Sequence, residues 1–426
     1  MNRPLAADRA GCSRRDLLRG TLGAFGLAAF GPLDRALAAS PLSLPLRPAV
    51  ATQKFLVVVE LDGGNDTLNT VVPQGLGNYT LRRPTIALGS GLTEPLDSGP
   101  YATSQVRLNG RMTRLAQMYR NGEVALVHRV GYPSANQSHD TSKLIWSSGQ
   151  RDGLLSANGW IARYAGLAAP TPLGAVSVRR GRHRALTGGS TNPLTLDSLA
   201  AFRFDTDTAF TNNHRLRLEL VREMLQAQAG SVPRDALLTG HQLADQLGAA
   251  VTGYTSGVTY STASISQSLR DVAMMLQAGF ETRIFYTGFG GFDTHAAQGS
   301  STGTHGNLLA ALDEALLSFA DDCKAMGIWQ NCVVAVISEF GRRNFENGSS
   351  GTDHGAATCM LLTGGAVVPG EHGVLPTDQD LAQSVLPYRV DFRAVYAQLL
   401  RDHLGLADPA AVFTESFTSP VAVDVV

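Results

Sequence analysis

Short apolar runs alternate with longer amphipathic stretches along most of the chain. The runs are rich in β-branched or aromatic residues, as in strands buried on both faces, and lie at Lys54 to Leu61, Glu123 to Val130, Arg283 to Thr287 and Val333 to Ile337. Apolar residues at helical spacing predict helices at 106–119, from 159 onward, at 268–280 and at 307–326, with Asp391 as the N-cap of a last helix. This alternation predicts a doubly wound α/β fold, with a mostly parallel sheet and helices on both faces.

The segment from about 200 to 265 departs from this alternation. Residues 214–229 and 234–250 have helical periodicity, and a Gly-Ser-Val-Pro break at 230–233 separates them. A polar stretch at 252–267 follows. We interpret the segment as a helical insertion in a single α/β domain that spans residues 54–426.

The N-terminus has the features of an export signal. Residues 13–19 (SRRDLLR) form a twin-arginine pattern, and residues 20–33 form an apolar run that is too short to span a bilayer as a mature helix. Ala36-Leu37-Ala38 supplies the small residues of a cleavage site. We therefore predict a signal peptide at 1–38 and a Pro-rich lead-in at 39–53. The predicted mature protein is periplasmic or secreted, exported by the twin-arginine machinery, and has no stable membrane span.

Composition narrows the class of protein further. Of 426 residues, 44% are hydrophobic and 17% charged, which excludes disordered and fibrous classes. The formal net charge is −1, and no basic excess indicates a nucleic-acid partner. Outside the signal, the placement of Cys323 and Cys332 allows a disulfide and leaves Cys359 as an odd thiol.

Acidic residues and histidines cluster in turns that follow the apolar runs. Asp293 and His295 follow one run, Glu339 and Arg342 follow another, and Asp353-His354 comes shortly afterwards. Because ligands of open α/β sheets bind beyond the carboxyl ends of the strands, we expect these turns to converge on one site. Oxygen and nitrogen donors without thiolates suit Zn²⁺, Mn²⁺ or a mixed pair.

Two earlier turns add candidates with alternative interpretations. The first strand runs into Asp62-Gly-Gly-Asn-Asp66, which fits either metal-binding carboxylates or a decorated Gly-Gly turn. Because a third glycine is missing, this is not a dinucleotide-binding fingerprint. After the second strand, Ser138 and His139 precede a predicted helix, where Ser138 is either a nucleophile near a positive helix end or a helix cap.

Six segments together resemble a bacterial family exported by the twin-arginine route, the "domain of unknown function fifteen-oh-one" family. They are LDGGNDTLNTVVP (61–73), NQSHDTS (136–142), GWIARY (159–164), GGFDTH (290–295), SEFGRR (338–343) and ENGSSGTDHG (346–355). By fold this family is grouped with the alkaline phosphatase, sulfatase and cofactor-independent phosphoglycerate mutase superfamily. The resemblance implies an alkaline-phosphatase-like α/β domain.

The resemblance also implies roles, because the superfamily keeps its ligands in a fixed chain order. Asp62 or Asp66 takes the place of the first metal ligand and Ser138 that of the nucleophile, with His139 as its rival, either as a metal ligand or as the phosphoryl acceptor. The later ligands are Asp293, His295, Glu339 and His354, with Asp353 as a further candidate. Two departures weaken one metal position: the pair is spaced Asp-x-His, and Phe340 stands where a His is expected.

These implications lead to an expected function. We expect an exported metal-dependent hydrolase of phosphate or sulfate esters, acting through Ser138 or a metal-bound water on a small anionic ester or sugar-linked substrate. One divalent ion, Zn or Mn, should bind tightly, with Arg342 facing the substrate anion. The alternatives are a non-catalytic secreted binding or assembly protein and a carbohydrate-modifying enzyme that uses the same site.

Overall fold

The central strand of the fold is β1 (Phe55–Asp62), in which every residue before Asp62 is buried. It belongs to a computed structural model that describes residues 52–151, 158–202, 219–220, 223–224 and 232–426. The predicted signal peptide and most of 214–229 therefore lie outside the described residues. The described residues fall into two compact units, one within 199–252 and the other comprising 52–198 and 253–426.

The main sheet of the second unit runs in the order β11-β5-β10-β9-β1-β8-β6-β7, with β12 paired to β5. β1 pairs in parallel with β8 on one side and β9 on the other, while β10 is antiparallel to both of its neighbours. The other strands of this sheet are β5 (Val124–Gly131), β6 (Ala175–Val178), β7 (Leu194–Leu196), β8 (Ile284–Gly290), β9 (Cys332–Ile337), β10 (Thr358–Thr363), β11 (Gly370–Gly373) and β12 (Val390–Asp391). The predicted α/β class with a mostly parallel sheet is confirmed.

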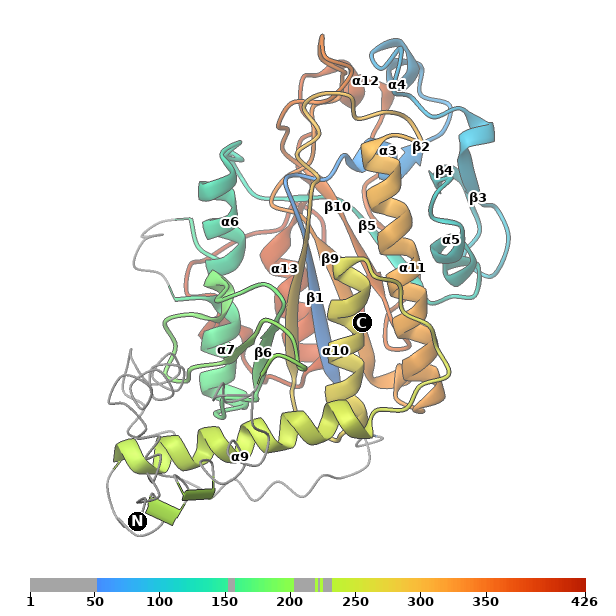
Figure 1. Ribbon diagram of the computed structural model, residues 1–426. Coiled ribbons are helices and arrows are strands. Elements are labelled where there is room, and N and C mark those ends of the chain that lie inside the picture. The colour runs from blue at the N-terminus through green and yellow to red at the C-terminus, as the bar shows by residue number, and fades with distance from the viewer. Residues whose placement is uncertain (1–51, 152–157, 203–218, 221–222, 225–231) are drawn as a thin grey trace, which may run out of the picture. The chain divides into compact units, whose positions relative to one another are not determined.

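Helices cover both faces of this sheet (Figure 1). On one face, aromatic residues of α6, α7 and α13 pack on β1, β8 and β9 in one core cluster, which includes Trp146, Trp160 and Phe392. On the other face α10 and α11 pack together, and α10 contacts β8. The bounds are α6 (His139–Ser148), α7 (Trp160–Ala168), α10 (Ser264–Gln277), α11 (Thr304–Ala325) and α13 (Phe392–Gln398). The Asp391 side chain caps α13 by accepting the Arg393 N–H, as predicted.

The smaller elements include one correction. The helix predicted over 106–119 is wrong in its first part, because β4 (Thr103–Asn109) is a strand and α5 (Thr113–Arg120) begins only after it. Val106 and Leu108 are buried, and Arg107 between them is half-buried. Val106 pairs with β2, and Leu108 pairs with both β2 and β3. Such pairing between strands is not visible in the spacing of apolar residues. The remaining elements are β2 (Val71–Pro73), β3 (Thr93–Leu96), α3 (Thr67–Thr70), α4 (Gly77–Leu81), α9 (Val232–Gly253) and α12 (Asp378–Ala382). α9 lies where the helical insertion was expected.

The three cysteines of the described residues form no disulfide. Cys323 and Cys332 are buried and free, and Cys359 is a free, half-buried thiol. Among the described helices, none is long and apolar enough to cross a bilayer.

Candidate metal centre

The candidate site lies where β1, β8 and β9 end side by side. β1 leads into Asp62, β8 into the turn with Asp293, and β9 into Ser338-Glu339. The first helical residue of α6, His139, reaches the same place after β5. The expected convergence of these turns is therefore seen in the structure.

The Gly63-Gly64 pair lets the end of β1 pass against the Asp293 turn. Gly63 has φ +122°, and a Cβ atom there would lie 2.4 Å from the backbone nitrogen of Asp293. The Gly63 N–H donates to Glu339 Oε1 at 2.9 Å. At Gly64 a Cβ would lie 2.3 Å from the Phe340 ring, so neither position has room for a side chain.

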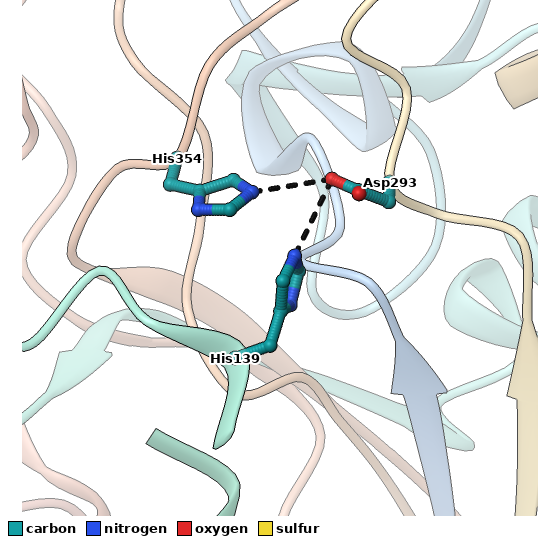
Figure 2. Close-up of side chains that lie close together, drawn as sticks. All are labelled: His139, Asp293 and His354. Atoms are coloured by element: carbon teal, nitrogen blue, oxygen red, sulfur yellow. Dashed lines mark hydrogen bonds and ion pairs between the residues drawn. The ribbon is translucent and has the colours of Figure 1, made fainter. Parts of the chain in front are cut away.

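Asp293 Oδ1 is the point on which three imidazole rings converge. The Nε2 atoms lie 3.1 Å away in His295, 3.2 Å in His354 and 3.5 Å in His139. Figure 2 shows His139 and His354 approaching the same carboxylate oxygen from two sides. The Nε2 atoms of His295 and His354 are themselves only 2.8 Å apart.

The other nitrogen of each ring faces a hydrogen-bond acceptor. The Nδ1 contacts are 2.8 Å from His139 to Glu339 Oε1, 3.1 Å from His295 to Asp353 Oδ1 and 2.7 Å from His354 to the Gln137 carbonyl. Because an ionised carboxylate or a carbonyl can only accept, each Nδ1 carries the ring proton. The three Nε2 lone pairs then face inward, the tautomer in which second-shell acceptors hold metal-binding histidines.

The charges of the group suit a cation. Burial raises the pKa of Asp293, but the Arg342 guanidinium outweighs it and lowers the pKa to about 2. Burial, together with Arg342 and His139, lowers the pKa of His354 below its usual value. At neutral pH the group therefore offers one carboxylate and neutral imidazole, which are ligands of Zn²⁺ and similar ions.

One set of donors is close enough to share an ion. Among the described residues, the only group of three or more His, Cys, Asp or Glu with ligand atoms within 4.8 Å of one another is His139, Asp293 and His354. His295 adds a third nitrogen beside Asp293 and His354. Two or three nitrogens with one carboxylate oxygen fit one ion.

The structure places Asp62 and Glu339 differently from the metal ligands expected of them. Lys143 of α6 pairs with Asp62 Oδ1, and Arg180 Nη1 lies 2.9 Å from Asp62 Oδ2. Although burial raises the pKa of Asp62, Lys143 and Arg180 lower it below its usual value. Glu339 is fully buried and holds His139 in place rather than belonging to the close group. Asp353 likewise contacts His295, with Asn347 donating to its Oδ1 at 2.9 Å.

Asp66 does not join the group. Its buried carboxylate accepts from Arg83 Nη1 at 2.7 Å and from Gln298 Nε2 at 2.6 Å. Burial raises the pKa of Asp66, and Arg83 lowers it to a value below the usual one. The buried Arg83–Asp66 ion pair holds the turn after β1 in place.

Arg342 has a supporting position rather than the expected substrate-facing one. Its side chain is fully buried and donates to the Gly64 and Thr352 carbonyls at 2.7 Å each. Its Nη2 donates to the Phe292 carbonyl at 3.0 Å and to Asp293 Oδ1 at 2.6 Å, and also to the Gly63 carbonyl. With its donors used in this way, Arg342 fixes Asp293.

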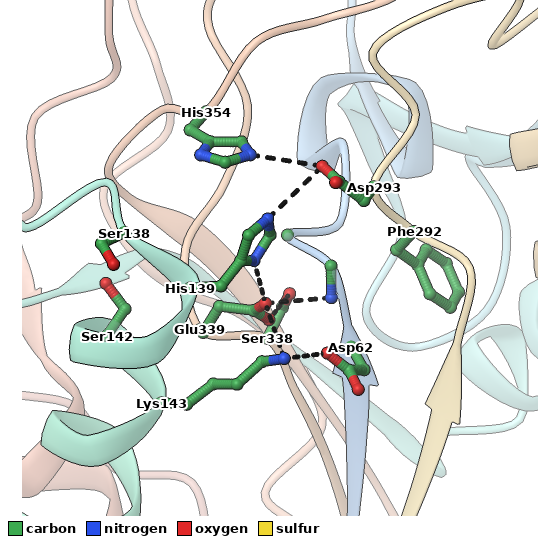
Figure 3. Close-up of polar contacts among 12 residues, drawn as sticks. Asp62, Ser138, His139, Ser142, Lys143, Phe292, Asp293, Ser338, Glu339 and His354 are labelled. Atoms are coloured by element: carbon green, nitrogen blue, oxygen red, sulfur yellow. Dashed lines mark hydrogen bonds and ion pairs between the residues drawn. The ribbon is translucent and has the colours of Figure 1, made fainter.

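Phe340, which stands where a His is expected, forms an apolar wall of the site. Its ring centroid lies 4.9 Å from that of His139 and 4.8 Å from that of His354. Ser138, at the N-cap position of α6, is exposed and makes no side-chain capping bond, so the cap interpretation gains no support. Figure 3 shows Ser138 at the start of α6, next to His139.

Lys143, Arg180 and Gln137 are site residues that the sequence analysis did not single out. Lys143 lies four residues after His139, a spacing that puts both side chains on one face of a helix. That spacing was the available signal for Lys143. Nothing local indicated that Arg180 would reach Asp62 or that the Gln137 carbonyl would accept from His354.

The family described as "Protein of unknown function (DUF1501)" matches residues 211–417. The matched segment comprises 207 of the 426 residues, just under half of the chain. It contains the turns with Asp293, Glu339 and His354, whereas the matching motifs at 61–73, 136–142 and 159–164 lie before it. No curated protein matches the sequence at a significant level.

Several solved structures match this chain. One is the Zn complex of the C-terminal periplasmic domain of EcEptC from Escherichia coli, with 10% identity and a TM-score of 0.39. The match covers 88% of this chain and 92% of that chain. An alkaline phosphatase superfamily protein from Vibrio parahaemolyticus matches at 11% identity and TM-score 0.37, over 90% and 77%. Alkaline phosphatase from the Antarctic bacterium TAB5 matches at 11% identity and TM-score 0.30, over 79% and 96%. Because these TM-scores are below 0.5, nothing about the site of this chain follows from them.

Proposed function

We propose that the protein is an exported metal-dependent hydrolase of phosphate or sulfate esters. The observation that carries the proposal is the convergence of three Nε2 lone pairs on the Asp293 carboxylate, with each ring oriented by an acceptor on its far side. Side chains arranged in this way would repel one another without a cation between them. His139, Asp293 and His354 are the residues that would hold it.

A divalent ion at this position supplies positive charge to a bound ester and lowers the pKa of an attacking hydroxyl or water. Glu339 and the Gln137 carbonyl keep His139 and His354 in the ligand tautomer. Arg342 keeps Asp293 ionised and in place. Lys143 and Arg180 both pair with Asp62, so this carboxylate adds no uncompensated negative charge that would repel an anionic substrate.

Ser138 is the candidate nucleophile of this chain. Its exposed hydroxyl makes no capping bond with α6, and it directly precedes His139. A hydroxyl in this position would attack the ester phosphorus or sulfur and lose its proton as the bond to the alcohol breaks and the alcohol leaves. Water would then hydrolyse the resulting seryl ester, which releases the acid and restores the hydroxyl. If Ser138 is not the nucleophile, a water activated at the same ligands takes its role.

The test is an assay of purified protein, loaded with Zn²⁺ or Mn²⁺, against aryl phosphate, phosphodiester and aryl sulfate esters. We expect hydrolysis of at least one class, and a loss of roughly 10³-fold or more in kcat for Ser138→Ala at unchanged metal content. Ser134→Ala, in the exposed loop before α6, is the matched control. A Ser138→Ala rate equal to that of the wild type would assign the attack to water. A fully metal-loaded protein with no activity on any ester would instead support the binding or assembly role.

A further inference from the structure

We propose that the Lys143 ammonium is a built-in cation that fills the position of a second metal ion between Asp62 and Glu339. The inference rests on the proposed function, because it assumes one divalent ion held by the His139, Asp293 and His354 group. It makes a claim that the proposed function does not: the site holds one exchangeable metal ion and one permanent positive charge, the Lys143 ammonium. Nothing in the sequence motifs assigned a role to Lys143.

Lys143 reaches this position because of its place on α6. His139 and Lys143 are four residues apart on the helix, so both project from one face. Both approach the same oxygen, Glu339 Oε1, with His139 Nδ1 at 2.8 Å and Lys143 Nζ at 3.9 Å. Figure 3 shows the Lys143 side chain extending from α6 to Asp62 and lying below Glu339.

The two carboxylates are already neutralised by groups of the chain. Asp62 Oδ1 pairs with Lys143, and Asp62 Oδ2 pairs with Arg180. On Glu339, Oε1 accepts the Gly63 N–H as well as the His139 proton, and Oε2 lies 3.2 Å from Ser338 Oγ. A divalent ion would have to displace these donors and approach two positive side chains, so the residues present do not fit a second ion.

Arg180 is held firmly in this arrangement. Its Nη2 lies 2.8 Å from Glu60 Oε2, and Glu60 is buried at the level of Gly288 in the neighbouring strand. A side chain at Gly288 would meet Arg180, with a Cβ only 2.5 Å from its Nε. The Arg180 guanidinium is therefore fixed beside Asp62 Oδ2. Lys143 lies on the other side of Asp62, between it and Glu339.

The choice of lysine is informative in this chain. Lys54, Lys143 and Lys324 are its only lysines, among 35 Lys and Arg residues in total. An ammonium is a compact point charge, closer to a metal ion than the planar guanidinium fork. Lys143 lies between the carboxylates of Asp62 and Glu339, next to the proposed metal ligands. This position suits a substitute for a metal ion better than it suits an ordinary ion pair on the surface.

Metal stoichiometry tests this directly, without an activity assay. We expect about one equivalent of Zn²⁺ per chain in the wild type, and a rise to two equivalents in Lys143→Ala at saturating Zn²⁺, measured by equilibrium dialysis and elemental analysis. The second equivalent should be absent from the Asp62→Asn/Lys143→Ala double variant. Lys324→Ala, which removes an ammonium paired with Glu123 away from this group, should stay at one equivalent.

The outcomes separate the two proposals. One equivalent in both the wild type and a folded Lys143→Ala protein would overturn this inference and leave the proposed function intact, as would two equivalents in the wild type. No bound ion in the wild type would overturn both. Should Lys143→Ala fail to fold by circular dichroism, Lys143→Met keeps the stem of the side chain without the charge and gives the same readout.

Discussion

The Nε2 atoms of His295 and His354 lie 2.8 Å apart, although neither ring has a spare proton for that contact. The Nδ1 of His295 donates to Asp353, and the Nδ1 of His354 donates to the Gln137 carbonyl. Two neutral rings would then point lone pairs at each other. Either one ring binds a second proton or a metal ion lies between the rings and Asp293, and burial, which lowers the pKa of His354, disfavours the second proton on that ring.

Asp353 is predicted to tune the metal affinity through His295. In Asp353→Ala the Nδ1 of His295 loses its acceptor, so the ring is freer to rotate and to change tautomer. We expect Zn²⁺ affinity to fall by roughly 10–100-fold, as is typical when an acceptor behind a metal ligand is removed. Chelator competition measures the change. The control Asp97→Ala, on an exposed turn, should bind Zn²⁺ like the wild type; equal affinity in Asp353→Ala would show that His295 is not a ligand.

Gly63 is predicted to be required for both stability and the site. In Gly63→Ala the new Cβ would overlap the backbone of Asp293, and φ +122° is strained for any L side chain. We expect a loss of roughly 2–5 kcal/mol in the free energy of unfolding, together with weaker metal binding. Gly75→Ala is the control, because Gly75 has φ +72° and no atom within 4 Å of its Cβ. Urea unfolding should show only about 1 kcal/mol there; equal losses in the two variants would refute the close approach at Asp293.

His403 is predicted to make stability depend on pH away from the site. It is buried under β1 and lies 2.9 Å from the Phe55 carbonyl, and burial lowers its pKa from 6.5 to about 4. The unfolded chain binds this proton near pH 6.5, so the stabilisation is complete above that pH and is lost as the pH falls through 4. By pH 4 the stability lost through His403 is on the order of 3 kcal/mol.

The measurement for His403 is the free energy of unfolding between pH 7 and 4. His403→Gln keeps a donor for the Phe55 carbonyl but cannot titrate, so its stability should fall less steeply than that of the wild type. Only the slope matters, since the substitution itself changes the absolute stability. Parallel curves for the two proteins would assign the pH dependence to other groups.

The strands that position the site were predictable because their signal is local. β1, β8 and β9 each contain a short run of consecutive apolar residues, and the turns after them were identified from the same runs. Phe340 lies beside His139 and His354 because it directly follows Glu339 at the same strand end. Strand order in a parallel sheet then brings the three turns together.

The choice between neighbouring acids was not predictable, because it depends on distant partners. Asp62 and Asp66 lie in one turn, and Arg83 and Gln298 withdraw Asp66 from the site. Arg342 likewise donates to the carbonyls of Gly63, Gly64 and Phe292, which are far from it in sequence, and these bonds keep its guanidinium away from a substrate. These contacts exist only once the sheet has formed.

We propose that the convergent imidazole rings and Asp293 hold one divalent ion. Elemental analysis of the purified protein tests it most directly, with His354→Ala as the comparison and thermal unfolding with added Zn²⁺ as the check on binding. We predict about one equivalent in the wild type and a large loss in His354→Ala. At Zn²⁺ 100 times above Kd, binding should stabilise the wild type by about 2.7 kcal/mol. A wild-type protein with no bound metal and no shift in Tm on adding Zn²⁺ or Mn²⁺ would contradict the account.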